Sequence, residues 1–252
     1  RKLDAATLFI DHAFSWSDFR STTAWRTFET VNREDEDGTN RIALYFDTAN
    51  IEDNTSFYQE FKFSGQSDAV DWVAGVSYYS EDAKQASDTH AFTDSIDTVL
   101  RNLGLVGTPD GTLFGFTSDV LAAYQIPLTM RGLPWREVMN NEGTFEATAL
   151  FGDVIWHATD RMNVTFGLRY THDEKEFSWL NGPRQAPELD ATVAALEAGG
   201  FFADPAWPIP PEAYNFDVVF AFPPINGQEI EGQKVKLQDS WDDISPRLVI
   251  DY

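Results

Sequence analysis

A short basic and aromatic cluster is the part of the sequence best suited to bind a ligand. It consists of Arg131, Trp135 and Arg136, and it is the only basic cluster within long, acidic stretches of the chain. The guanidinium groups can donate hydrogen bonds to a carboxylate or catecholate chelate, and the indole ring offers a stacking surface. The alternative is that the cluster is a strut that pins its loop to neighbouring segments.

Aromatic residues crowd a second stretch of the chain. The candidate ligand-contacting residues here are Trp207, Tyr214 and Phe216. They belong to a larger aromatic group that also contains Phe201, Phe202, Phe220 and Phe222. This density indicates either a ligand-facing surface or a small hydrophobic cluster that packs the loop down.

The carboxylates and histidines form no pattern that predicts catalysis or metal binding. Glu60 and Lys62 lie two residues apart on one face of a predicted strand, which indicates an ion ladder rather than an acid/base pair. An EF-hand reading of the acidic stretch 34–38 would place Phe46 where the terminal Glu ligand belongs. The four histidines lack metal-ligand spacing. We therefore expect no catalytic residue, no metal site, no cofactor and no enzymatic activity.

Alternation of apolar and polar residues with a period of two is the main structural signal. In residues 162–175, Val164, Phe166 and Leu168 share one face, and polar residues occupy the other. Helical periodicity would scatter these residues around a helix, so the segment is predicted to be a strand. Similar runs predict about seven strands in all, the others being residues 6–14, 19–32, 57–64, 70–79, 144–157 and 244–252.

The predicted connections alternate between short and long. Residues 15–18, 66–69 and 158–161 are polar turns suited to hairpins, whereas the other connections are long loops at residues 34–54, 80–143 and 178–243. Helical spacing predicts short helices inside two of these loops, near residues 92–103 and 189–196, each followed by glycine. Short turns at one end and long loops at the other are typical of an outer-membrane barrel.

The charge of the chain follows the same division. The net charge is −23, and the three long loops carry −19 of it. Charge on a lipid-facing strand is costly, so a membrane barrel concentrates it in loops and lumen. An acidic chain of this kind is not expected to bind nucleic acid, because phosphate binding needs a basic surface. There is no cysteine, which excludes disulfides and thiol chemistry.

Four sequence motifs, in order along the chain, resemble those of TonB-dependent outer-membrane receptors. Residues 21–26 (STTAWR) are similar to an early-barrel strand of that family, and residues 58–64 (YQEFKFS) with 71–75 (DWVAG) are similar to the following hairpin. Residues 159–161 (TDR) with 167–175 (GLRYTHDEK) resemble a mid-barrel hairpin. Residues 245–247 (SPR) resemble the opening of a later strand. Together the motifs cover nearly all the strand residues.

The resemblance implies an all-β, up-and-down transmembrane barrel of 22 strands. Residues 1–252 would be a partial β-barrel domain with about seven of those strands, short periplasmic turns and long extracellular loops, while the plug domain and the remaining strands would be absent. The implied location is the bacterial outer membrane, in contact with lipid and lipopolysaccharide. The implied function is import of a scarce nutrient, by default a ferric siderophore, with cobalamin, haem and oligosaccharides as other family ligands. Import would be energised by a TonB-type periplasmic coupling protein that acts through the plug.

A barrel gives the two faces of each strand different surroundings. The polar face is expected to line the lumen and includes Glu60, Lys62, Arg169 and Arg247. Arg169 would contact plug or substrate, or form an ion pair with Asp153 or Asp173. The apolar face is expected to contact lipid, and it includes Trp72, Val76, Val164, Phe166 and Leu168.

Two other classes of protein fit parts of the sequence. One is a soluble, acidic, all-β carbohydrate-binding module or adhesin. The other is a glycoside hydrolase that uses two carboxylates about 5–9 Å apart. A second sheet packed on Val164, Phe166 and Leu168 would favour these soluble proteins over the transporter.

Overall fold

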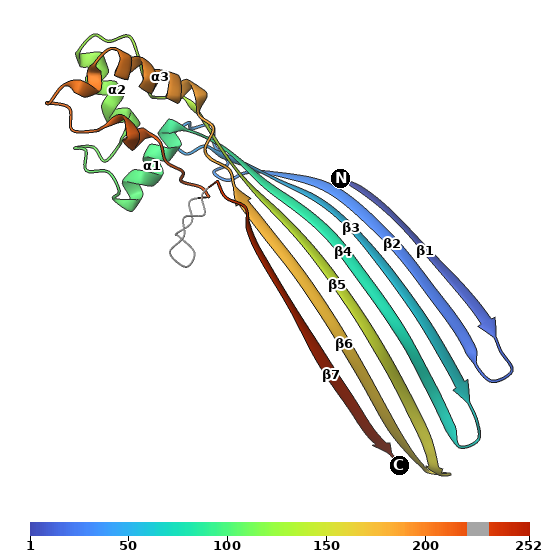
Figure 1. The fold of residues 1–252 in the computed structure, drawn as a ribbon. Helices are drawn as coiled ribbons and strands as arrows, with labels where there is room; N and C mark the ends of the chain where they lie inside the picture. Colours follow the sequence, from blue (N-terminus) through green and yellow to red (C-terminus); the bar gives the residue numbers. More distant parts are fainter. Residues whose placement is uncertain (221–231) are drawn as a thin grey trace.

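A computed structural model describes residues 1–220 and 232–252 of the chain. Seven strands form one antiparallel sheet in which each strand pairs with the next along the sequence (Figure 1). This confirms the predicted all-β, up-and-down arrangement. The strands are β1 (Lys2–Ala13), β2 (Asp18–Asp35), β3 (Phe46–Gln66), β4 (Val70–Phe92), β5 (Pro134–Thr159), β6 (Met162–Asn181) and β7 (Val235–Asp251).

The two ends of the sheet differ in how the strands are joined. Tight turns at residues 14–17, 67–69 and 160–161 join the hairpins at one end. The long connections all lie at the opposite end, where the helices gather (Figure 1). The predicted alternation of short and long connections is therefore present, and it places every long connection at the same end of the sheet.

The strands are longer than the sequence pattern predicted. The connections expected at residues 34–54, 80–143 and 178–243 shorten to residues 36–45, 93–133 and 182–234, because β3, β4, β5, β6 and β7 extend into them. The added parts of the strands carry polar residues on both faces, as in Glu81, Asp82 and Lys84 of β4. Backbone pairing continues there without an apolar face, so period-two alternation does not mark it.

The register of the strands assigns every side chain to one of two faces, because directly opposed residues of an antiparallel pair point the same way. Val76 pairs with Leu150, and Phe166 pairs with both Val154 and Leu248, so these residues share one face. Large apolar side chains on this face are exposed, with Val76 at 41%, Phe166 at 53% and Leu168 at 56%.

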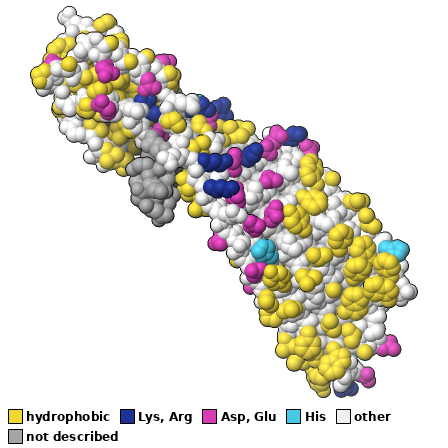
Figure 2. Space-filling view, viewed as in Figure 1, with side chains coloured by type: hydrophobic (Ala, Val, Ile, Leu, Met, Phe, Trp, Pro, Cys, Tyr) yellow, Lys and Arg dark blue, Asp and Glu magenta, His cyan; other side chains and the backbone are white. Residues whose placement is uncertain are grey.

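We call the face that carries Val76, Leu150, Val154, Phe166, Leu168 and Leu248 the apolar band. Figure 2 shows hydrophobic side chains gathered over the part of the sheet nearest the short turns, while charged side chains lie farther along it. Within the described part of the chain all seven strands belong to one sheet, so no second sheet covers the band. A second sheet packed on Val164, Phe166 and Leu168 would have favoured a soluble protein, and the described residues form no such sheet. The register also places Trp72 of β4 and Val164 of β6 in the band, opposite Val154 and Trp156 of β5. Val164, which was expected to contact lipid, is only 9% exposed.

The buried core lies in the connections rather than in the sheet. Three helices, α1 (Thr93–Leu103), α2 (Phe114–Ala123) and α3 (Pro187–Ala198), pack together with two short 3₁₀ turns at Phe201–Ala203 and Pro211–Tyr214. Fully or nearly fully buried members of this core include Ile96, Leu100, Leu113, Phe114, Leu121, Met130, Leu189 and Leu196. None of the described helices is long and apolar enough to cross a membrane.

Two of the three helices lie where the sequence predicted them. Helix α1 ends at Gly104, whose φ of 66° is the left-handed conformation expected of a glycine that follows a helix. Helix α3 begins with Pro187 and is followed by Gly199. Helix α2 was not predicted, because apolar residues lie around most of its circumference and give no amphipathic signal.

Candidate ligand-binding site

Two connections that are far apart in sequence fold into one unit, which we call the helical cluster (residues 93–133 and 182–220). Its core joins α1 and α2 from the first connection to α3 and Tyr214 from the second. The Tyr214 hydroxyl lies 2.8 Å from the Thr117 hydroxyl of α2. The two connections therefore act as one packed body on the strand ends rather than as two separate loops.

Asp97 fixes the angle between α1 and α2. Its carboxylate is buried and accepts three backbone hydrogen bonds at the start of α2, from Leu113 (2.7 Å), Phe114 (3.1 Å) and Gly115 (2.7 Å). The N-terminus of a helix carries partial positive charge that suits an anion. Burial nevertheless raises the pKa of the Asp97 carboxyl, against the lowering effect of these donors.

Glu137 joins the second connection to the sheet. This buried side chain of β5 accepts the indole N–H of Trp135 at 2.8 Å. It also accepts the backbone N–H groups of Val218, Val219 and Phe220, each at 2.9 Å. One carboxylate thus satisfies four donors, and it holds the segment 218–220 against the first residues of β5.

The two arginines of the predicted basic cluster form ion pairs with neighbouring segments. Arg131 donates to both carboxylate oxygens of Asp119, at 2.6 and 2.9 Å. This contact holds the pKa of the Asp119 carboxyl below its usual range. Arg136 donates to both oxygens of Asp88, at 2.7 and 2.9 Å, and to Gln185 at 2.8 Å. Both guanidinium groups therefore fasten their loop to neighbouring segments, which is the geometry of the strut alternative.

Trp135 and Tyr214 lie in the core, although the sequence offered them as ligand contacts. Each is 1% exposed. The Trp135 ring lies 5.4 Å from that of Phe216 and beneath the Arg184 guanidinium at 5.1 Å. Burial raises the pKa of Tyr214 to about 12. In this conformation the two side chains stabilise the cluster and present almost no surface to solvent.

The other predicted aromatic residues are partly buried. The Trp207 ring stacks on Phe116 at 5.9 Å and contacts Phe201 at 4.9 Å. Phe216 packs on Phe114 and lines a cavity. Phe222 lies outside the described residues. The aromatic stretch therefore forms much of the loop packing, and Phe216 is the member that also faces open space.

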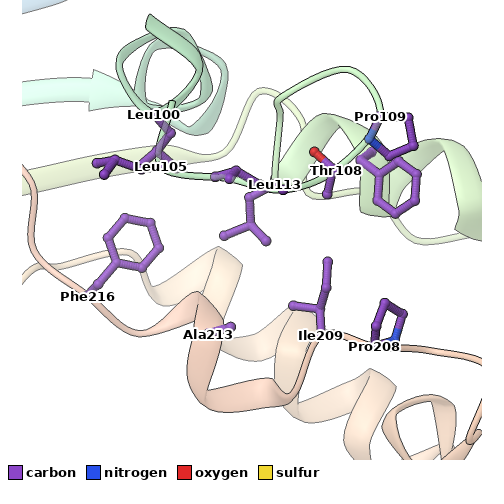
Figure 3. A pocket seen from close by; sticks show the side chains of 12 residues that line it. Leu100, Leu105, Thr108, Pro109, Leu113, Pro208, Ile209, Ala213 and Phe216 are labelled. Carbon is purple, nitrogen blue, oxygen red and sulfur yellow. The ribbon is translucent and has the colours of Figure 1, made fainter. Parts of the chain in front are cut away.

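That cavity separates the two halves of the helical cluster. One wall comes from the end of α1 and the loop that follows, including Leu100, Leu105 and Leu113, and the other from residues 208–216 (Figure 3). Its volume is about 510 Å³. This cavity cannot be predicted from local sequence patterns, because its two walls lie about 100 residues apart in the chain.

The polar face of the sheet holds the four residues predicted to line a lumen. The register places Glu60 and Lys62 of β3, Arg169 of β6 and Arg247 of β7 on the face opposite the apolar band. Tyr58 donates a hydrogen bond to Glu60 at 2.9 Å.

Arg169 has a different neighbour from the carboxylates expected to pair with it. Arg247 lies 3.5 Å from Asp153, while Arg169 lies over the Phe151 ring at 5.7 Å. Asp153, expected to pair with Arg169, is therefore the partner of Arg247. The reason is the register, which puts Phe151 directly opposite Arg169 and puts Gly167 between Asp153 and Arg247.

Sequence reasoning missed the residues that organise the helical cluster. The carboxylates of Asp97 and Glu137 accept backbone donors that lie 16–18 and 81–83 residues away along the chain, respectively. Ser118 lies inside α2, where its hydroxyl accepts the backbone N–H of Met130 at 2.9 Å. Such contacts carry no local pattern, so they cannot be predicted from spacing.

Comparison with known proteins gives one structural likeness. No model of a known protein family matches the sequence, and no curated protein matches it. The fold is similar to the crystal structure of the ferric yersiniabactin uptake receptor FyuA from Yersinia pestis, with a TM-score of 0.54 and 14% sequence identity over 98% of this chain. The chain spans 25% of the length of that receptor. At this identity the likeness concerns the fold.

Proposed function

We propose that the chain forms part of the wall and surface loops of an outer-membrane transporter that imports a ferric chelate. The observation that carries the proposal is the exposed apolar band beside the short turns, with a polar face behind it and the helical cluster at the far end. In this arrangement the band contacts lipid, the polar face lines the lumen, and the helical cluster faces the outside of the cell. The likeness of the fold to a ferric chelate uptake receptor supports the same role.

The height of the band suits a bilayer. On β6 the apolar side runs from Met162 to Tyr170, and on the same face Glu174 and Glu176 follow beyond His172. Nine strand residues measure about 30 Å along the strand. At the tilt usual for membrane barrels, this gives roughly 23 Å, close to the apolar band of about 25 Å in such barrels. Carboxylates begin where the strand would leave the hydrocarbon.

The proposal requires further strands beside β1 and β7, the outer strands of the described sheet. Backbone groups at an open sheet edge cannot remain unpaired in lipid. Residues 1–252 would then be one portion of a larger barrel domain, with periplasmic turns and extracellular loops. Energy would come from a TonB-type periplasmic coupling protein acting through a plug, and lipopolysaccharide would surround the outer part of the strands.

Chelate uptake by living cells tests this function. The gene is deleted in its bacterial host, and uptake of radioactive iron is measured for catecholate, hydroxamate and phenolate chelates, with and without complementation. We expect uptake of at least one chelate to depend on the gene and on the proton gradient, and the protein to fractionate with outer membranes. Uptake unchanged for every chelate, with the protein in the soluble fraction, would contradict the proposal.

A further inference from the structure

The cavity between the two halves of the helical cluster offers almost exclusively apolar contacts. Among the described residues that line it, none carries a charge, and Thr108 is the one polar side chain. The Thr108 hydroxyl already donates to the carbonyl oxygen of Thr112 at 2.6 Å. Because a polar ligand group would lose its hydration here without gaining a partner, the cavity favours hydrocarbon.

The cavity is large enough for a small ligand or a hydrocarbon chain. Its 510 Å³ fall within the range of small-molecule sites, roughly 300–1,000 Å³. A second cavity of about 600 Å³ shares Phe116 and Pro208 with it and continues toward α3. In the second cavity Asp204 is the one charged lining residue within the described part of the chain. The two hollows are therefore neighbours, and apolar side chains line most of each.

One lining residue marks the entrance. Leu105 follows the glycine that ends α1 and is 66% exposed, although it also lines the cavity. Covering an exposed leucine at the rim with hydrocarbon removes apolar surface from water and so favours binding. Leu100 and Leu113 are buried, and they line the cavity together with the partly buried Phe216 (Figure 3).

The charge of the surroundings limits the head group of such a ligand. The described residues of the helical cluster contain ten acidic residues and three arginines. A carboxylate head at the entrance would therefore meet like charge, whereas an uncharged or cationic head would not.

We infer that the cavity holds the hydrocarbon chain of an amphiphilic ferric chelate whose head is uncharged or cationic. The inference rests on the proposed function, which brings a chelate to the outer side of the loops. It adds the chemical class of the ligand and assigns the chain-binding residues to both connections. A bound chain would then join the two walls of the cluster and fix its conformation.

Photolabelling of the full-length protein in lipid nanodiscs tests the inference. The probe is dodecyl maltoside with a diazirine at the end of its chain. After irradiation, we expect adducts on residues 105–113 and 208–216, together with adducts on the strands of the apolar band. Ala213→Trp fills the cavity and should lower the cavity adducts by about tenfold, while Ala195→Trp, on the exposed side of α3, should not change them.

Leu105→Asp provides a second variant that should still fold, because Leu105 is exposed and its replacement disturbs no buried contact. It should also lower the cavity adducts, whereas strand adducts stay constant in every variant. Labelling confined to the strands of the wild-type protein would overturn the inference and leave the proposed membrane wall intact. Labelling of the cavity without labelling of the strands would contradict the proposed wall instead.

A competition experiment tests whether the cavity binds the chain of a chelate. An acylated ferric hydroxamate should displace the probe from the cavity, and the same hydroxamate without its chain should not. Equal displacement by both compounds would overturn the inference, because the chain would then make no contribution. The strand adducts serve as the internal control, since neither compound should reduce them.

Discussion

The apolar band and the helical cluster use the same kinds of residue in opposite ways. Leu168 of the band is 56% exposed, whereas Leu121 of the cluster is completely buried. In water, an exposed apolar surface of the size of the band is characteristic of an interaction surface. Under the proposed function the two regions meet different solvents: the cluster folds like a small core in water, and the band contacts hydrocarbon.

Polar side chains also differ between the helical cluster and the sheet. In the cluster, the carboxylates of Asp97 and Glu137 are buried and accept backbone donors. On the sheet, polar side chains pair across neighbouring strands, as Thr23 does with Gln59 at 2.6 Å. Removing a buried acceptor should therefore cost far more than removing a polar group from the surface.

The largest effect is expected for Glu137→Leu. This substitution leaves the indole of Trp135 and three backbone donors without their acceptor, and should destabilise the cluster by about 4 kcal/mol. Hydrogen exchange at residues 218–220 measures the loss. Glu146→Leu on the same strand, where the side chain is exposed, is the matched control. Unchanged exchange in Glu137→Leu would show that this carboxylate does not hold the segment.

A charge placed on the apolar band should have the next largest effect. Leu168→Arg should destabilise the protein in lipid by about 2–4 kcal/mol if the residue lies near the bilayer centre. Thr171→Arg puts the same charge on the opposite face of β6, directly across from Asp243, and should cost little. Urea unfolding in lipid vesicles compares the two. Equal stability of both variants would contradict the assignment of the faces.

A smaller, pH-dependent effect is expected for Tyr214→Phe. Loss of the hydrogen bond to Thr117 should cost about 1 kcal/mol at pH 8. Because burial raises the pKa of Tyr214 to about 12, the folded state favours the neutral phenol. Its contribution to stability is fully present below the unfolded pKa of about 10 and is lost as the pH rises toward 12.

Unfolding at several pH values between 8 and 12 tests this linkage. The wild-type protein should lose more stability over this range than Tyr214→Phe does. Tyr124→Phe, which changes an exposed tyrosine, should behave like the wild type. The same alkaline loss in Tyr214→Phe as in the wild type would rule out a role for this phenol.

The smallest effect is expected for Arg131→Ala. Its ion pair with Asp119 is half exposed, so the substitution should change stability by at most about 0.5 kcal/mol. Chelate affinity, measured by iron uptake at several chelate concentrations, distinguishes the two roles of this arginine. A strut predicts unchanged affinity. A clear loss of affinity with unchanged stability would instead support direct ligand contact.

The sequence predicted the fold best where one face of a strand is apolar. All seven strands were recognised from such segments, but the outer parts of β4 and β5 were not, since polar residues occupy both faces there. Helix α1 was recognised from its spacing and from Gly104, whereas α2 has apolar residues around most of its circumference and so gives no amphipathic signal. The prediction therefore succeeded for strands and helices that have one apolar and one polar face, because the apolar residues then recur with a regular period.

The candidate site was less predictable than the fold. The sequence marked Arg131, Trp135 and Arg136 as candidate ligand contacts. The partners of the two arginines, Asp119 and Asp88, are set by tertiary contacts and could not be predicted. The role of Glu137 was not predicted, because its backbone partners lie more than 80 residues away. A side chain whose role depends on distant backbone groups has no signature in local spacing.

The most direct test of the account is the solvent that each residue of β6 meets. The chain contains no cysteine, so single cysteines at residues 162–176 can each carry a spin label. In lipid vesicles, labels at even positions from 162 to 170 should collide with oxygen, which concentrates in lipid, and odd positions should not. From residue 172 onward, even positions should instead meet a water-soluble nickel complex. Strong collisions with nickel at 164, 166 and 168 would contradict the claim that the apolar band faces a membrane.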